Sequence, residues 1–464
     1  MTRLAIIGGG PNGLFQLAAF QELKNQGVEI PEITVFERQD QIGGLWNYNW
    51  RTGIDKDGYP AHNSMYRHLW TNAPKDCLEL PDYSFEHHFG EATCTYPPRA
   101  AIRDYICGYL DHHKVDQSQV RCGTVVKNLQ FNEETKKFEL DVKNSKADYQ
   151  EIFDYVIVAI GHFSIPVMPQ FDLKDFAGIV LHSHDFKSAE GYKGQNVVVV
   201  GASFSAEDVA SQLYKFGAKN VYLAHRKADA EGKWTPTGYK WPEGMQEKPN
   251  LRGAKGRMAT FEDDSQAEVD AIVLCTGYKH SFPFLPKDLM LHCENKLWIK
   301  QLHFSTISRQ NPKLFFLGME NQFFTMNCFS SKARWVRDVI MGKIDPEVPM
   351  VDGSGKEITD QDFQDLLDKV ASTTDGQILQ GKFTECMMVA TGYAKEFIEP
   401  AKFTAHICQH FYEWEQNKKV NIMTFRDVPH VSGVTGNTAP KPAQGKEWLK
   451  NFADTTDYYK SLHK

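Results

Sequence analysis

The segment LAIIGGGPNG, residues 4–13, places an unbroken apolar run directly before three glycines in G-x-G-x-x-G spacing, Gly8, Gly10 and Gly13. An apolar run without polar alternation is typical of a parallel strand buried on both faces. In such a loop the first glycine allows a tight turn, the second lets backbone N–H groups approach a pyrophosphate, and the third lets the next helix pack against the strand. The segment therefore predicts a strand, a phosphate-binding loop and a helix over residues 14–24.

An acid follows at the end of the next predicted strand. Residues 33–36 end in Glu37, 24 residues after Gly13, close to where a carboxylate accepts hydrogen bonds from a ribose hydroxyl. A glycine turn before a helix also occurs without any ligand, but the strand, the helix and the acid together favour nucleotide binding. Gly43 and Gly44 then indicate either a plain loop or a backbone that passes close to a large ligand.

A second unit of the same kind begins with the apolar run at residues 197–200. Gly201 follows it, Ser203 and Ala206 stand where the other two glycines would be, and residues 207–216 have helical periodicity. A serine hydroxyl can donate to phosphate, and alanine still permits close packing of the helix. The phosphate-binding role of this loop is therefore retained.

The two units differ in the residue that would meet the ribose. The strand predicted at residues 220–224 ends in His225 and Arg226 instead of an acid. An acid would repel a ribose 2'-phosphate, whereas a guanidinium can bind it with two parallel hydrogen bonds. We expect the second unit to bind NADP(H) and the first to bind an unphosphorylated ribose such as that of FAD. The alternative for Arg226 is an ordinary surface charge.

The stretch FAGIVLHSHDF, residues 176–186, lies between the two units. Its histidines His182 and His184 suggest a metal or a general base, but no third ligand is evident. We interpret His182 as a structural residue at a domain junction. The stretch is expected to join the FAD and NADP domains and to set their relative orientation.

These patterns predict an α/β protein with two Rossmann-like dinucleotide-binding domains, the second inserted into the first. The expected bounds are 1–168 for the first part of the FAD domain, 169–279 for the NADP domain, and 280–464 for the second part of the FAD domain with a C-terminal helical region. Further strands are expected at 120–126, 137–142, 155–160, 269–274 and 314–317, helices at 101–112 and 332–341, a loop-rich stretch at 227–264 and a helical pattern over 345–375.

Composition limits the class of protein. The net charge is -7, from 52 basic and 59 acidic residues, which argues against a nucleic-acid partner. The nine cysteines are scattered, which favours a reduced cytoplasmic compartment, and no cysteine pair follows Glu37 as a pyridine-nucleotide disulfide reductase would require. The apolar runs are too short to span a bilayer, and the polar segment 451–464 offers no tail anchor. We expect no membrane association, no metal site and a homodimer.

By its motifs the sequence resembles the flavin-containing monooxygenases over nearly its whole length. The matching features share their order and spacing with that family. They are Gly8-x-Gly10-x-x-Gly13, Glu37, Gly43 to Trp46, Asn72, Phe176-x-Gly178-x-x-x-His182-x-x-x-Phe186, Gly201 to Ala206, Thr276 to Tyr278, Gly318 to Gln322, and Asn421 to Asp427.

The resemblance implies two cofactors and the residues that hold them, with Asn72 as the catalytic residue. For Asn72 the alternative is a turn residue that bonds its own backbone. The FAD residues implied are Gly8, Gly10, Asn12, Gly13, Glu37, Gln39, Leu45, Trp46, His62, Val125 or Val126, and Gln322. The NADPH residues implied are Ser203, Phe204, Ser205, Arg226, Thr276 and Gly277, with Trp70 and Asn72 where nicotinamide meets flavin.

The resemblance also implies the reaction. NADPH reduces the flavin, O2 adds to give a C4a-hydroperoxyflavin, and the nitrogen of a small tertiary amine such as trimethylamine, or a soft sulfur, takes up one oxygen atom. Phe323 and Phe324 would line the substrate site, where aromatic faces attract an ammonium-like group. The alternatives are a ketone-oxygenating (Baeyer-Villiger type) monooxygenase, whose related fingerprint usually ends in tryptophan where Phe186 stands, and a non-catalytic redox sensor.

Overall fold

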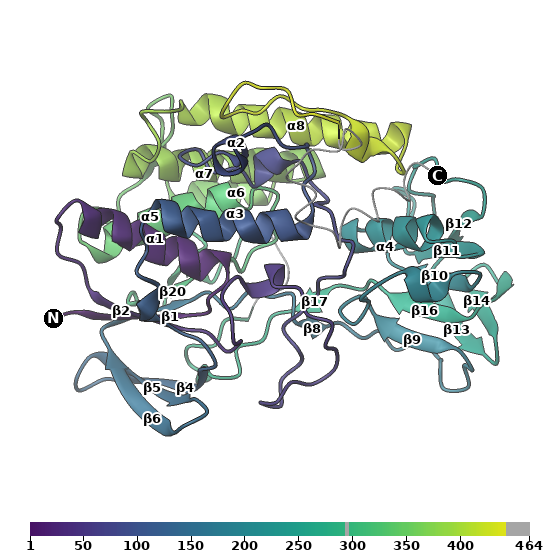
Figure 1. The fold of residues 1–464 in the computed structure, drawn as a ribbon, viewed down its shortest axis with the longest axis horizontal. Coiled ribbons are helices and arrows are strands. Elements are labelled where there is room, and N and C mark those ends of the chain that lie inside the picture. Colours follow the sequence, from purple (N-terminus) through teal and green to yellow (C-terminus); the bar gives the residue numbers. More distant parts are fainter. Residues whose placement is uncertain (293–296, 442–464) are drawn as a thin grey trace.

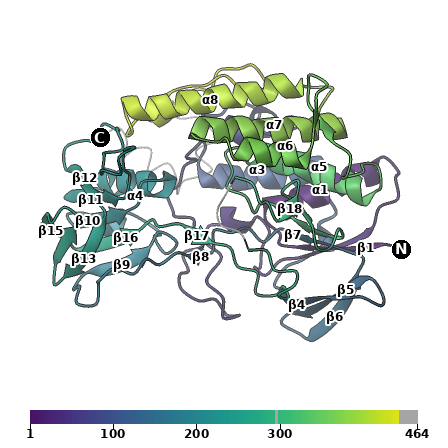
Figure 2. The same cartoon turned by 180° about the vertical axis from the view of Figure 1, so that it is seen from behind.

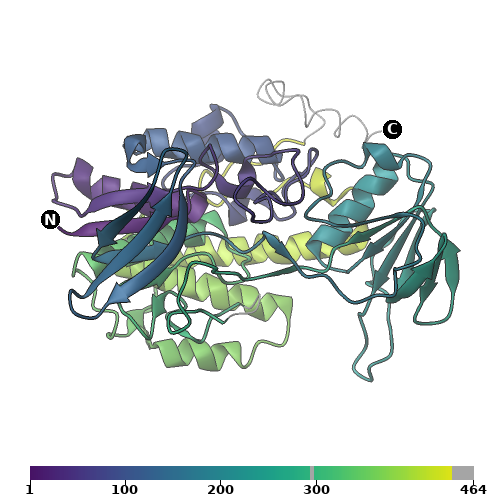
Figure 3. The same ribbon diagram turned by 90° about the horizontal axis from the view of Figure 1, so that it is seen from below.

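The computed structural model describes residues 1–292 and 297–441, so that Cys293 and the polar segment 451–464 lie outside the described residues. Two sheets form two lobes that lie side by side (Figures 1 and 3). The larger lobe holds both the N-terminal residues and the C-terminal helices, and the smaller lobe is made from the middle of the chain. The expected fold, with one dinucleotide-binding domain inserted into another, is confirmed.

The sheet of the larger lobe has β1, the strand of the opening motif, near its centre. Its strand order is β18-β19-β20-β7-β1-β2-β3, and the strands from β20 to β3 run parallel. These strands are β1 (Arg3–Ile7), β2 (Glu32–Phe36), β3 (Val120–Arg121), β7 (Tyr155–Val158), β18 (Leu302–His303), β19 (Ile307–Ser308) and β20 (Leu314–Phe316).

Both faces of this sheet are covered, which is why β1 is apolar without alternation. Leu4 and Ile6 pack against helices, while Ala5 and Ile7 pack against a second, antiparallel sheet. The helices on the first face are α1 (Pro11–Asn25), α3 (Arg99–His112) and α5 (Met326–Ile340), and the covering sheet consists of β4 (Val125–Asn132), β5 (Lys137–Lys143) and β6 (Asp148–Phe153).

The smaller lobe repeats this arrangement around β10. Its parallel sheet has the order β12-β11-β10-β16-β9; Val197 and Val199 pack towards α4 and Val198 and Val200 towards a small antiparallel sheet. The elements are β9 (Ile179–His182), β10 (Asn196–Val200), α4 (Phe204–Lys215), β11 (Asn220–His225), β12 (Met245–Pro249), β13 (Leu251–Lys255), β14 (Met258–Phe261), β15 (Gln266–Glu268) and β16 (Ala271–Leu274).

A two-stranded ribbon links the lobes. The outgoing strand β8 (Ile165–Pro166) pairs antiparallel with the returning strand β17 (Tyr278–Lys279). The ribbon is extended by the N–H of Val167, which donates to the carbonyl of Gly277 at 2.9 Å. The two crossings of the chain between the lobes therefore lie against each other.

The C-terminal part of the chain is helical and lies over the larger lobe (Figure 2). The long helix α8 reaches the smaller lobe, where the side chain of Lys418 pairs with Glu207 of α4 at 3.0 Å. The elements are β21 (Met350–Val351), β22 (Glu357–Ile358), α6 (Asp360–Leu367), α7 (Thr373–Thr391) and α8 (Pro400–Val420). The short helices elsewhere are η1 (Gly44–Trp46), η2 (Lys75–Cys77), α2 (Phe85–Phe89), η3 (Gln117–Gln119), η4 (Glu190–Tyr192) and η5 (Phe425–Asp427).

Four expectations about individual elements are wrong. Residues 227–264, expected to be loop-rich, contain β12, β13 and β14, which were not recognised because these strands are short and partly polar. Residues 345–375 hold a hairpin and α6 rather than continuous helix. The strand expected at 120–126 is broken by Gly123 at φ 64°, and α5 begins at Met326, six residues early, where the side chain of Asn327 bonds the carbonyl of Asp76.

Among the described residues no helix is both long and apolar enough to cross a membrane.

Candidate functional site: a cavity beneath the first glycine loop

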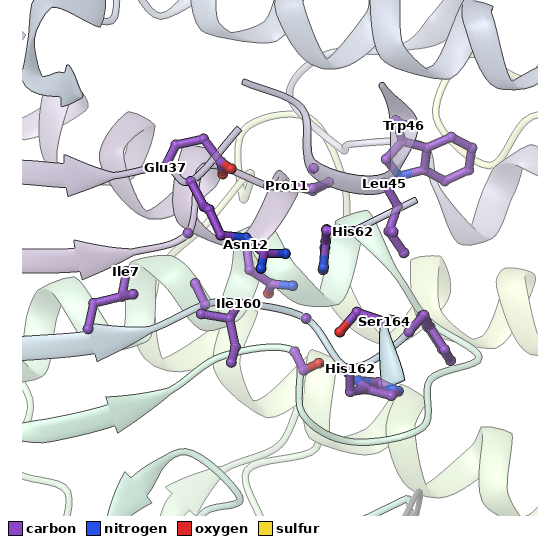
Figure 4. A pocket seen from close by; sticks show the side chains of 18 of the residues that line it. Ile7, Pro11, Asn12, Glu37, Leu45, Trp46, His62, Ile160, His162 and Ser164 are labelled. Atoms are coloured by element: carbon purple, nitrogen blue, oxygen red, sulfur yellow. Dashed lines mark hydrogen bonds between the residues drawn. The ribbon is translucent and has the colours of Figure 1, made fainter. Parts of the chain in front are cut away.

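A cavity lies at the carboxyl edge of the larger sheet, beneath the β1–α1 loop (Figure 4). This is the edge at which open α/β sheets bind their ligands. Its walls come from the glycine loop, the end of β2, η1, the loop after Tyr59, the segment after β7 and residues near Gln322. In Figure 4 the side chains of Asn12, Glu37 and His62 surround one common space.

The glycine loop is built for close approach of the backbone. Gly8 has φ 113°, and a Cβ there would stand 2.5 Å from the carbonyl oxygen of Ala159. A Cβ on Gly13 would stand 2.0 Å from the carbonyl oxygen of Gly8, so that only glycine lets α1 pack this closely. Gly10 is the N-cap of α1 and offers no side chain to the first-turn N–H groups. The helix terminus can therefore bind an anion in the cavity.

Glu37 is fixed by the loop itself. Its Oε2 accepts the N–H of Gly9 at 2.6 Å, and its Oε1 accepts the N–H of Gln39 at 2.7 Å. Burial raises the pKa of this carboxyl, and the two backbone donors oppose the shift. The side chain is only 6% exposed, yet it still lines the cavity, so the remaining lone pairs of its oxygens can meet a ligand.

Several buried polar atoms in the cavity wall lack a hydrogen-bond partner. They are Oδ1 of Asn12, both amide atoms of Gln322 and Oε2 of Glu320. The other oxygen of Glu320 contacts Nζ of Lys332, whose pKa burial lowers to about 7. Buried polar groups in native proteins are almost always paired, so these atoms fit a ligand with a polar edge, such as a flavin.

Most of the residues expected at FAD come together here. The exceptions are Gly13, which lies beneath the loop, and Gln39, whose amide donates to the carbonyl of His62 at 3.2 Å. Burial lowers the pKa of His62 to about 4, with Arg38 adding to the effect, so its imidazole is neutral at pH 7. The expected residues that line the cavity are Gly8, Gly10, Asn12, Glu37, Leu45, Trp46, His62, Val125, Val126 and Gln322.

The segment after β7 forms another wall of the cavity. His162 lines the cavity, its Nδ1 lies 3.1 Å from the carbonyl oxygen of Gly318, and its ring stacks on His280 with centroids 4.6 Å apart. The sequence indicates this wall, because a strand end followed by a glycine, here Gly161, often marks a backbone crossing near a cofactor.

The residues expected at NADPH lie outside this cavity, at the carboxyl edge of the smaller sheet. Gly201 follows β10 at φ 134°, where a Cβ would stand 2.5 Å from the carbonyl oxygen of Cys275. Ser203 is the N-cap of α4, and its hydroxyl makes no capping bond. Ser203, Ser205, Arg226 and Gly277 are all exposed, whereas the hydroxyl of Thr276 donates to the carbonyl of Val167 at 2.7 Å.

The loop that carries Trp70 and Asn72 is held from two sides. The N–H of Thr71 donates to the carbonyl of Pro97 at 3.0 Å, and Nε of Arg426 donates to the carbonyl of Thr71 at 3.1 Å. Trp70 is buried, and Asn72 is exposed and does not line the cavity.

A buried carboxylate joins the two lobes, and sequence reasoning missed it. Asp208 of α4 accepts from the guanidinium of Arg426 at 2.9 Å, from the hydroxyl of Tyr66 and from the amide of Gln212 at 3.1 Å. The motif containing Arg426 was noticed, but nothing in the sequence connects it with Asp208, 218 residues away.

Residues 176–186, expected to join the two domains, belong to the smaller lobe, where residues 179–182 form the edge strand β9, and the lobes are linked by β8 and β17 instead. The C-terminal end of the stretch contacts the larger lobe. His184 donates from Nε2 to the carbonyl of Ala61 at 2.6 Å, and the ring of Phe186 meets that of Tyr66 with centroids 5.6 Å apart. Nδ1 of His182 accepts the N–H of His184 at 3.1 Å. Burial, with His184 adding to it, lowers the pKa of His182 to about 4. The stretch contacts the 61–66 loop through hydrogen bonds and ring packing.

The aromatic residues expected near substrate do not line the cavity. Phe323 and Phe324 are 8% and 1% exposed and pack in an apolar cluster with α7 and α8, and neither lines the cavity. The N–H of Phe323 donates to the side chain of Gln380 at 2.7 Å. The ring of Phe204 packs against Trp414 of α8, with centroids 5.4 Å apart.

Comparison with known proteins agrees with this geometry. A family model described as flavin-binding monooxygenase-like matches residues 1–242 and 243–391. The chain is 44% identical to a trimethylamine monooxygenase of Methylocella silvestris, covering 99% of this chain and 98% of the relative, and 42% identical to one of Roseovarius nubinhibens, covering 98% and 99%. The crystal structure of Tmm from Pelagibacter sp. strain HTCC7211 matches with a TM-score of 0.86 and 38% identity, covering 97% of this chain and 100% of that chain. The chain belongs to the flavin-binding monooxygenase-like family.

Proposed function

We propose that the protein is an NADPH- and O2-dependent monooxygenase that transfers one oxygen atom to the nitrogen of a small tertiary amine such as trimethylamine. The observation that carries the proposal is the identity of 42–44% over nearly the whole chain to two trimethylamine monooxygenases. The amine becomes an N-oxide, the second oxygen atom leaves as water, and NADPH supplies the two electrons. Soft sulfur nucleophiles are proposed as further substrates.

FAD is proposed to bind in the cavity, held by residues 1–168 and 280–464. The N-terminus of α1 would take the pyrophosphate, Glu37 the ribose hydroxyls, and the amides of Asn12 and Gln322 the polar edges of the flavin, since these atoms are buried without partners. When bound, the flavin supplies the redox chemistry and activates oxygen, and the chain supplies orientation and a site closed to water.

NADPH is proposed to bind along the carboxyl edge of the smaller sheet, within residues 169–279. Ser203 and Ser205 stand at the first turn of α4, where N–H groups and the helix dipole favour phosphate. Arg226 directly follows β11, is exposed, and can bind the 2'-phosphate with two parallel hydrogen bonds. Phe204, Thr276 and Gly277 complete the proposed set.

Asn72 is proposed as the catalytic residue, beside Trp70 at the junction of nicotinamide and flavin. Its loop is fixed by Pro97 on one side and by Arg426 on the other, and Arg426 also holds Asp208 of the smaller lobe. An amide in a loop fixed to both lobes can offer a preorganised donor where the two cofactors meet. We further propose a homodimer located in the cytoplasm, as the sequence suggested.

A substrate panel tests the proposal. The FAD-loaded protein is given NADPH and O2 with trimethylamine, a dialkyl sulfide or cyclohexanone, while NADPH consumption, peroxide and product are followed together. N-oxide formation that matches NADPH consumption, with little peroxide, is expected. A faster conversion of cyclohexanone to lactone would favour ketone oxygenation instead, and release of peroxide alone with every compound would refute the proposal.

A further inference from the structure

A group of histidines and acids, none of which has a cofactor role proposed above, lies where α8 meets η2 and the segment after η5. Asp76 comes from η2, His406, His410 and Glu413 from α8, and His430 from the segment after η5. We call these five residues the His410 cluster. Their ligand atoms fall into two trios, Asp76 with His406 and His410, and His410 with Glu413 and His430, and within each trio all atoms lie within 4.8 Å of one another.

The contact between Asp76 and His410 has the geometry of two ligands rather than of a donor and an acceptor. Oδ2 of Asp76 and Nδ1 of His410 are 3.2 Å apart, yet both atoms are buried and neither is aligned for a hydrogen bond. Two ligands held at about 2.0–2.1 Å from a tetrahedral ion stand roughly 3.3 Å apart. The other oxygen of Asp76 lies 3.7 Å from Nε2 of His406.

His430 gives a second and independent observation. It is 4% exposed, and both of its ring nitrogens are buried without a hydrogen-bond partner. Its ring lies 4.5 Å from that of His410, centroid to centroid. An imidazole with no partner for either nitrogen is costly to bury, and a metal ion in reach of the ring removes that cost.

Helix spacing suits the same interpretation. His406 and His410 are four residues apart, so that both lie on one face of α8, with Glu413 three residues further. Two imidazoles and one carboxylate on facing segments are ligand types that a zinc-class ion binds.

We propose that the His410 cluster binds a divalent cation of the zinc class, with Asp76, His406 and His410 as ligands and with Glu413 and His430 beside them. Imidazole nitrogens with one carboxylate suit Zn²⁺, whereas Mg²⁺ and Ca²⁺ prefer oxygen ligands. His406 exchanges its hydrogen bond to the carbonyl of Val431, 2.9 Å in this structure, for the ion.

The ion would join segments far apart in sequence and close to the flavin cavity. The carbonyl of Asp76 accepts from the side chain of Asn327, and the carbonyl of Cys77 accepts the N–H of Thr325 at 3.0 Å. Thr325 lines the cavity. A cation at the cluster therefore ties α8 and the 430 segment to the segment that supports one wall of the flavin site.

Metal binding to the full-length, tag-free protein tests the proposal. The protein is freed of metal with a chelator, dialysed and titrated with Zn²⁺ or Mg²⁺, and bound metal is measured by mass spectrometry after desalting. One equivalent of zinc and none of magnesium is expected. Zinc should raise Tm by about 2 °C or more, because an ion that binds only the folded state stabilises it.

Three variants place the ion. His410→Asn and His430→Ala should each weaken zinc binding at least tenfold, while His87→Ala, a change at an exposed histidine, should leave it unchanged. Flavin content and circular dichroism check that each variant folds. Zinc retained equally by the His410 and His430 variants, or no zinc retained by the wild-type protein, overturns the proposal. The test on the wild-type protein remains valid even where a variant fails to fold, because it asks only whether zinc is retained.

Discussion

Replacing Glu37 by glutamine should weaken FAD binding without unfolding the protein. The carboxylate accepts two backbone N–H groups, from Gly9 at 2.6 Å and from Gln39 at 2.7 Å, and its remaining lone pairs face the cavity. A glutamine keeps one acceptor oxygen and turns an NH2 group towards the other backbone donor. One hydrogen bond to a charged group is lost, and one buried N–H is left unpaired.

The size of the effect follows from these contacts. A hydrogen bond to a charged group contributes roughly 1.5–3 kcal/mol. Burial raises the pKa of Glu37, so that removing its charge offsets part of this loss. We expect the unfolding free energy of the apoprotein to fall by about 1–2 kcal/mol. The missing ribose acceptor should raise the Kd for FAD roughly 10- to 100-fold, since about 1.4 kcal/mol corresponds to tenfold.

The assay is titration of apoprotein with FAD, followed by quenching of flavin fluorescence, together with thermal unfolding. Glu134→Gln is the matched control. It replaces a glutamate by a glutamine as well, but at an exposed position in the turn between β4 and β5. A Kd for FAD within about threefold of the wild-type value, with unchanged stability, would refute the role given to Glu37.

Three further predictions concern the junction and the acid stability of the fold. Asn72→Ala should still accept hydride but divert NADPH oxidation to hydrogen peroxide, because such a donor is worth roughly 3–4 kcal/mol in related sites; a peroxide assay during turnover checks this, and coupled turnover would contradict it. His182→Gln should raise the Kd for NADP⁺ while FAD stays bound, because the His182 ring packs on Tyr278, with centroids 5.1 Å apart, where the lobes join. Loss of FAD instead would contradict the role given to His182 at the junction. Burial alone raises the pKa of Asp82, but Arg334 outweighs it and holds the pKa at about 2, so the carboxylate stabilises the fold above about pH 4 and loses that effect as pH falls towards 2. Asp82→Asn should therefore lower the unfolding free energy at pH 7 by about 2 kcal/mol. In denaturant melts the variant should also lose less stability than the wild type between pH 4 and pH 2. An unchanged loss of stability over that range would contradict the role given to Asp82.

The two nucleotide units could be predicted because their signals are local. In each unit an apolar run, a glycine and a helix follow one another within about twenty residues, so that the pattern can be recognised without knowing which strands are neighbours. Gly8 and Gly201 both have positive φ and meet a carbonyl oxygen of the neighbouring strand. Glu37 could be placed for the same reason, because a strand end next to the loop determines its position.

The C-terminal helices could not be placed in the same way. Gln377, Gln380 and Thr384 of α7 are buried, so that polar residues occupy positions that an amphipathic pattern would give to apolar ones. The strands of residues 227–264 are similarly hard to recognise, since β12 and β13 have only five residues each and neither alternates polar and apolar residues.

Contacts between distant segments could not be predicted from one sequence. Asp208 and Arg426 meet across the two lobes, and Asp76 meets His406 and His410 from the other end of the chain. The spacing of His406 and His410 on one helix face is a local signal for the metal site that we propose. The burial of Phe323 and Phe324 was likewise hidden, because their partners on α7 and α8 had not been recognised as helices.

The paired strands β8 and β17 make the smaller lobe a removable module. Because Val167 and Gly277 are hydrogen-bonded neighbours, the entry and exit of the chain coincide in space. A short linker at that point could join the two parts of the larger lobe directly. The segment between Val167 and Gly277 could then be expressed separately, with its two termini close together. Two strands bonded to each other also resist swivelling while permitting a bend. Any opening between the lobes would also have to break the contacts of Arg426 with Asp208 and of Lys418 with Glu207.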